Sequence, residues 1–176
     1  MPAPNRAWWH LMWNTYGTWL PGDPRGFRNR HHRIHSSGDY RNPPPPGEHA
    51  GLHRYNHQRL PGEVVLRSTA IRRSVCDAMV RTLVELGARV MVVTVCRTHV
   101  HLVVEWPIDR CVFKAWMTKL KIESSKQIAE KVKGRGWGRG SKSVLIRSLR
   151  QRSTTFEYVR DRQEPGAAIW TYKDPI

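Results

Sequence analysis

Short apolar runs predict three β-strands in the first two thirds of the chain. Residues 7–16, which include Trp8, Trp9 and Trp13, favour a short buried strand over a helical turn. Residues 89–96 and 99–106 are rich in β-branched side chains, and only two residues separate them. Because β-branched residues pack well on a pleated sheet, these two runs predict a hairpin.

Apolar residues at helical spacing predict two helices around this hairpin. Between Ile71 and Leu86 they recur every three or four positions, and Gly87 follows as a helix terminator. After the hairpin, Asp109 is the expected N-cap of a long helix that reaches Ile128. Lysines are spaced along this second helix, so part of its surface is expected to be basic.

The last quarter of the chain predicts one more strand and one more helix. Residues 143–149 are a candidate strand. Thr154, with Glu157 three positions later, matches a capping box and predicts a helix to about Glu164, where Pro165–Gly166 ends it. The resulting order, β–loop–α–β–β–α–loop–β–α, favours an α+β fold: an antiparallel sheet with packed helices, ferredoxin-like or RRM-like.

Residues 28–62 interrupt this pattern and contain few side chains that could pack in a hydrophobic core. Four prolines stand in a row at 43–46, and six of the nine histidines fall here: His31, His32, His35, His49, His53 and His57. We therefore expect one domain over residues 1–176, with residues 28–62 as a long loop insert. No strand or helix fixes the spacing of these histidines, and no cysteine accompanies them. That favours solvated side chains near a phosphate backbone over a zinc site.

Charge narrows the class of partner. Thirty Lys and Arg against 14 Asp and Glu give a net charge of +16, while 39% hydrophobic residues suffice for one core. Such a charge favours a polyanionic partner, because each neutralised phosphate releases a condensed counterion.

No apolar run approaches the roughly 18 residues of a membrane span. The first nine residues lack signal-peptide order, and the three cysteines form no CxxC. A reduced, cytoplasmic, nucleoid-associated protein is expected, and no membrane association.

His99 and His101 are candidate metal ligands. Residues two apart on a strand project from the same face, while Val100 between them turns to the other. Two neutral imidazoles at that spacing can hold one divalent ion if other groups complete the site. The alternative is a hydrogen-bonded histidine pair at a strand end. Glu105, further along the same face, is expected to be a surface acid.

Tyr158, on the last predicted helix near Arg160 and Arg162, is a candidate nucleophile. A phenol attacks a phosphodiester if its proton leaves easily and a metal ion or arginine polarises the phosphate. The alternative is a tyrosine that simply packs beside Phe156 and Val159.

Basic residues in a glycine-rich loop and on the long helix are candidate DNA contacts. They are Arg135, Trp137, Arg139, Lys119 and Lys121. An aromatic ring among arginines can stack a base while the cations contact phosphates. The alternatives are a disordered basic linker for the loop and a solvated face for the helix.

The order of these motifs resembles the HUH single-strand nucleases with one catalytic tyrosine. Within them it resembles the REP-associated tyrosine transposases and related small insertion-sequence transposases. The resemblance rests on His99-Val100-His101 in an apolar hairpin, the long helix, the basic loop and Tyr158 on a late helix. Residues 13–26, Trp-Asn-Thr-Tyr-Gly-Thr-Trp-Leu-Pro-Gly-Asp-Pro-Arg-Gly, also look like the opening of that group. The resemblance implies an HUH nuclease fold and a transposase that nicks and rejoins single-stranded DNA, often at hairpin-forming repeats.

The same resemblance implies roles for individual residues. His99 and His101 would bind Mg²⁺ or Mn²⁺, and Tyr158 would form a reversible 5′-phosphotyrosine link with a free 3′-OH. The family's third ligand is a polar side chain, commonly Gln, one turn after the tyrosine. Arg162 stands there instead, and Gln163 lies about 140° round a helix from the tyrosine. Gln163 is the expected ligand if the helix ends early; Asp161 and a weakened site are the alternatives.

A non-catalytic nucleic-acid-binding module of the same fold, such as a domesticated transposase, is the alternative function. Metal dependence separates the two, because binding alone survives chelation and strand transfer does not. An RNA-binding RRM is disfavoured, since the strands lack the exposed aromatic pairs that stack bases. The sequence leaves open whether the protein is a monomer or a homodimer, and whether Tyr158 serves its own chain's histidines.

Overall fold

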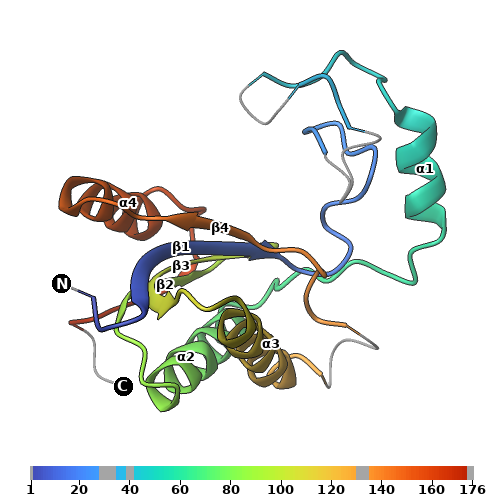
Figure 1. Cartoon of the computed structure of the whole chain (residues 1–176). Helices are drawn as coiled ribbons and strands as arrows, with labels where there is room; N and C mark the ends of the chain where they lie inside the picture. Colours follow the sequence, from blue (N-terminus) through green and yellow to red (C-terminus); the bar gives the residue numbers. More distant parts are fainter. Residues whose placement is uncertain (1, 28–34, 39–41, 130–134, 174–176) are drawn as a thin grey trace.

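The computed structural model describes residues 2–27, 35–38, 42–129 and 135–173. Its strands form one antiparallel sheet in the order β4-β1-β3-β2-β5, with helices packed on it, so the predicted α+β fold is confirmed (Figure 1). The elements in chain order are β1 (Arg6–Asn14), α1 (Ala50–Gln58), α2 (Thr69–Glu85), β2 (Val90–Val95), β3 (His99–Pro107), α3 (Arg110–Lys126), β4 (Lys142–Leu145), α4 (Leu149–Asp161) and β5 (Ala168–Thr171). Among the described helices, none combines the length and apolar content needed to cross a bilayer.

The order β1-α2-β2-β3-α3-β4, with β4-β1-β3-β2 in the sheet, is a ferredoxin-like arrangement. To it are added α1 in the insert, α4, and the edge strand β5, which pairs antiparallel with β2. Sequence analysis did not predict β5, because its four residues are too few to show an alternating pattern. The sheet therefore has two short edge strands, β4 and β5, on either side of three longer ones.

The two faces of the sheet carry different chemistry. Alternate residues of β3 enter the main core under α2 and α3: Val100, Leu102, Val104 and Trp106. The residues between them, including His99, His101 and Val103, face the other side, because successive side chains of a strand alternate. There α4 covers a smaller apolar cluster around Val103 and Val159. Figure 1 shows α2 and α3 on one face of the sheet and α4 on the other.

Both ends of α4 differ from the prediction. Thr154 and Glu157 lie inside the helix rather than at its start. The N-cap is Ser148, whose Oγ accepts a hydrogen bond from the Gln151 amide at 3.1 Å, while Gln151 Oε1 accepts from the Arg147 amide. This earlier Ser-x-x-Gln therefore satisfies one amide of the first turn and one amide just before the helix. The helix ends at Asp161, three residues before the expected end. The predicted N-cap of α3 is confirmed, since Asp109 accepts from two amides of the first turn.

The insert contains a helix that sequence analysis did not predict. The expected loop over residues 28–62 is wrong at 50–58, where α1 forms with no buried residue. Its mostly polar sequence gives no apolar stripe to signal a helix. The prediction for His31 and His32 lies outside the described residues.

The glycine-rich segment after α3 is fixed to the main core. Trp137 is only 5% exposed, its Nε1 donates to Ser124 Oγ at 3.0 Å, and its ring meets that of Trp13 edge to face. Lys121 Nζ donates to the carbonyls of Gly138 and Gly140 at 3.0 and 2.9 Å. The prediction that Trp137 stacks on bases is therefore wrong, because its ring is buried within the fold, whereas the predicted DNA contact of Lys121, which is partly exposed, stays a prediction.

Replacement of Trp137 by alanine is expected to destabilise the domain by about 3–5 kcal/mol, the usual result of removing a buried tryptophan. Urea unfolding measures the change. The matched control is Arg139→Ala, two residues away and exposed, which should stay within about 0.5 kcal/mol of wild type. Equal stability of the two variants would contradict the buried position of Trp137.

Lys121 makes stability depend on pH in the alkaline range. Burial lowers the pKa of its ammonium group from 10.5 to about 8. Between these values the unfolded chain binds more protons than the folded one, so folding stability should rise as pH increases from 8 to 10.5. The free energy of unfolding of wild type minus that of Lys121→Met should therefore grow across this range. Parallel pH profiles would show that the ammonium group is not desolvated.

Candidate active site

Four side chains converge on the face of the sheet that α4 covers. His99 and His101 come from β3, His10 from β1 and Tyr158 from α4. The ring centroids of His99 and His101 are 5.1 Å apart. The Tyr158 ring lies 5.8 Å from that of His101 and is 46% exposed. The structure thus brings together the predicted histidine pair and the predicted tyrosine within one chain, with the phenol open to solvent.

Sequence analysis missed His10. Nε2 of His10 lies 2.9 Å from Nδ1 of His101, and the two rings stack with centroids 5.2 Å apart. The register of β1 against β3 places Met12 opposite His101 and His10 opposite Val103. The two histidines are therefore diagonal neighbours on one face. The sequence does show a histidine among the apolar residues of β1. Its role in the site can be recognised only when the pairing of β1 with β3 is known.

Burial keeps the histidines of this site neutral. It lowers the pKa of His10 to about 4, with the nearby charge of Lys142 acting in the same direction. It lowers the pKa of His101 to about 3, and His10 and His99 add to that shift. Burial also lowers the pKa of His99, although its hydrogen bond with Gln163 opposes the change. Neutral imidazole is the form that offers a nitrogen lone pair to a metal ion.

Gln163 reaches this site because α4 ends early. After Asp161 the chain leaves the helix at Arg162, whose φ is −110°. The Gln163 amide group then folds back: Nε2 donates to the carbonyl of Tyr158 at 3.1 Å, and the side chain lies near enough to His99 to oppose the lowering of its pKa. Asp161, the alternative, pairs with its exposed neighbour Arg160 at 2.6 and 2.7 Å. The structure therefore places Gln163, and not Asp161, beside the histidine pair.

The residues present suit a hard divalent cation. Two imidazole nitrogens and an amide oxygen are a mixed donor set that leaves further positions for water and phosphate oxygens. In the described part of the chain, no three His, Cys, Asp or Glu side chains are grouped to hold a metal. Cys96 lies beside Gln163 at 3.8 Å, but burial raises the pKa of its thiol to about 11.

Glu105 is not the surface acid expected from the sequence. Its carboxylate is fully buried and accepts hydrogen bonds from Nε of Arg89 at 2.5 Å and Nη2 at 3.1 Å. It also accepts from the Ala3 amide. The Arg89 guanidinium holds the pKa of this carboxyl below its usual range. Glu105 therefore ties the chain before β1 to β3.

The other predicted DNA contacts come from α3 and from the segment that follows it. Lys119 is on α3, across the sheet from α4, and its Nζ is 3.8 Å from a Glu85 carboxylate oxygen. Arg135 and Arg139 are exposed at either end of the segment that carries Trp137. Both side chains are accessible to a partner, so their role in DNA contact stays a prediction.

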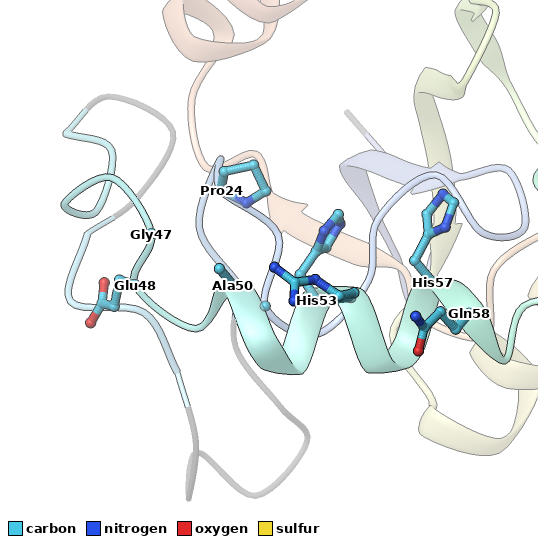
Figure 2. A pocket seen from close by; sticks show the side chains of 9 residues that line it. Pro24, Gly47, Glu48, Ala50, His53, His57 and Gln58 are labelled. Carbon is cyan, nitrogen blue, oxygen red and sulfur yellow. The ribbon is translucent and has the colours of Figure 1, made fainter.

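A pocket beside α1 is lined mainly by residues of the histidine-rich insert. It has a volume of about 390 Å³ and is lined by Gly22, Pro24, Gly47, Glu48, Ala50, His53, Arg54, His57 and Gln58. Figure 2 shows His53 and His57 projecting from the same side of α1. Their ring centroids are 6.2 Å apart. None of its lining residues belongs to the site under α4, so the pocket is a separate feature.

The comparisons with known proteins bear on the backbone and not on these side chains. No family model and no curated protein matches this sequence. Among solved structures, the chain is similar to a REP-associated tyrosine transposase bound to a REP hairpin, with a TM-score of 0.47 and 11% sequence identity. The match covers 90% of this chain and 67% of that chain. The case for a function therefore rests on the geometry of the site.

Proposed function

We propose that this chain is a metal-dependent enzyme that nicks and rejoins single-stranded DNA through a covalent tyrosine intermediate, as a transposase of the HUH type does. The observation that carries the proposal is the convergence of His99, His101, Gln163 and Tyr158 on one face of the sheet. These residues come from sequence positions up to 64 apart, so their meeting is a property of the fold.

The chemistry assigned to the protein is a phosphoryl transfer to Tyr158. Its phenolic oxygen attacks the scissile phosphorus, the bond to the 3′-oxygen breaks, and the phenolic proton leaves in exchange for the proton that the 3′-oxygen acquires. The products are a 5′-phosphotyrosine and a free 3′-OH, and attack by a 3′-OH reverses the step. No oxidant or external energy source is needed, because one phosphodiester replaces another.

His99, His101 and Gln163 are the groups that would hold Mg²⁺ or Mn²⁺. When bound, such an ion polarises the phosphate and stabilises the charge that develops on it. The protein's own contribution is position: β3 fixes both imidazoles, and the end of α4 fixes Gln163 next to the carbonyl of Tyr158. The exposed phenol leaves room for a flexible DNA strand to enter.

The proposed partner is single-stranded DNA, with hairpin-forming repeats as the favoured form. The net charge of +16 supports a polyanion, and binding should weaken as salt increases. Because the histidine pair and Tyr158 lie together in one chain, one copy of the protein suffices for the reaction.

Loss of the Tyr158 hydroxyl should abolish the covalent product. With Mn²⁺ and labelled single-stranded hairpins, wild type is expected to give a labelled band at protein mass on a denaturing gel. Tyr158→Phe and His99→Ala should give none, since one lacks the nucleophile and the other a metal ligand. Tyr172→Phe is the matched control, because Tyr172 is similarly exposed and should keep the adduct.

Two outcomes would contradict the proposal. An adduct that persists in Tyr158→Phe would assign the nucleophile elsewhere. Tight binding that resists chelation and yields no adduct on any hairpin would favour the non-catalytic binding module.

Gln163 and Asp161 should differ in their effect on metal binding. Gln163→Ala is expected to weaken Mn²⁺ binding about tenfold or more, equivalent to ~1.4 kcal/mol, since it removes an oxygen donor beside His99. Asp161→Ala should leave it unchanged, because Asp161 pairs with Arg160. Electron paramagnetic resonance of free Mn²⁺ measures the Mn²⁺ affinity of both variants. The reverse order of effects would assign the third ligand to Asp161.

A further inference from the structure

The contact between His10 and His101 restricts where the protons of the two rings lie. Nε2 of His10 and Nδ1 of His101 are 2.9 Å apart, a hydrogen-bond distance. Between two neutral imidazoles, one nitrogen must carry the hydrogen and the other must offer its lone pair. Two arrangements are therefore available, and they leave different nitrogens of His101 free of hydrogen.

Only one of these arrangements suits a metal ligand. Nδ1 of His101 is occupied by His10, so Nε2 is the nitrogen that remains for an ion. It binds only without a hydrogen, which requires the hydrogen of His101 to lie on Nδ1. His10 Nε2 must then accept, and the hydrogen of His10 must lie on its own Nδ1.

We propose that His10 is a positioning residue that accepts a hydrogen bond from Nδ1–H of His101 and so holds Nε2 of His101 free of hydrogen. The choice between the two arrangements rests on the proposed function, because only a metal ion requires Nε2 of His101 to be free of hydrogen, whereas the tautomer can be measured without the metal. Partners that accept from the second nitrogen of a ligand histidine fix its tautomer and orientation in metal sites generally.

The surroundings of His10 hold its ring against that of His101. Its position is set by the β1–β3 register, which extends without interruption from Arg6 to Asn14. The stacked rings, inclined by 29°, restrict rotation of either imidazole.

The tautomer can be measured on the metal-free protein. Long-range ¹H–¹⁵N correlation spectra of histidine-labelled protein at pH 7 distinguish a nitrogen that carries hydrogen from one that does not. His10→Gln and His101→Gln variants assign the signals. The expected result is hydrogen on Nδ1 of both His10 and His101. Hydrogen on Nε2 of His101, or a mixture of its two tautomers, would overturn the proposal.

A pair of substitutions then tests the effect on metal binding. His10→Phe keeps a ring but has no acceptor, and it should weaken Mn²⁺ binding by roughly 10–100-fold. His10→Gln offers an amide oxygen near the position of Nε2 and should restore most of the affinity. Equal losses in both variants, with unchanged unfolding midpoints, would overturn the role of the acceptor. If wild type binds no Mn²⁺, the proposed function fails, and the tautomer measurement alone decides the proposal.

Discussion

β1 and β3 run antiparallel through the centre of the sheet, from Arg6 opposite Pro107 to Asn14 opposite His99. This pairing determines which side chains are buried together and which form the site. A shift by one residue would move the apolar set of β3 to the α4 face and would turn His99 and His101 into the core. The large apolar residues under α2 and α3, such as Leu102 and Trp106, oppose such a shift. The stability of the core and the geometry of the histidines thus have the same origin.

The end of α4 is the second constraint on the site. Had the helix continued to Glu164, Gln163 would project to a different side from Tyr158. Because Ser148 starts the helix and Asp161 ends it, the next residues are free to turn back toward β3. Glu164 takes part in this turn, since its carboxylate accepts from the Arg97 amide in the β2–β3 connection. The hairpin and the helix end are therefore held together next to His99.

Local sequence patterns predicted the parts of this molecule that depend on neighbours in the chain. The β2–β3 hairpin, the shared face of His99 and His101, and the Asp109 cap follow from spacing over a few residues. The start of α4 was misplaced because two capping sequences stand six residues apart, and local chemistry does not rank them. The contact of His10 with His101 and the burial of Trp137 depend on contacts between distant segments. They need the β1 register and the packing of α3, which no single stretch of sequence contains.

The short outer strands of the sheet limit how two copies of this protein can associate. β4 and β5 each span four residues, so either edge offers little backbone to an incoming strand. Lys142 on β4 adds an exposed charge that a second sheet would have to accommodate. A continuous intermolecular sheet is thereby disfavoured, both as an ordered dimer and as the start of an aggregate.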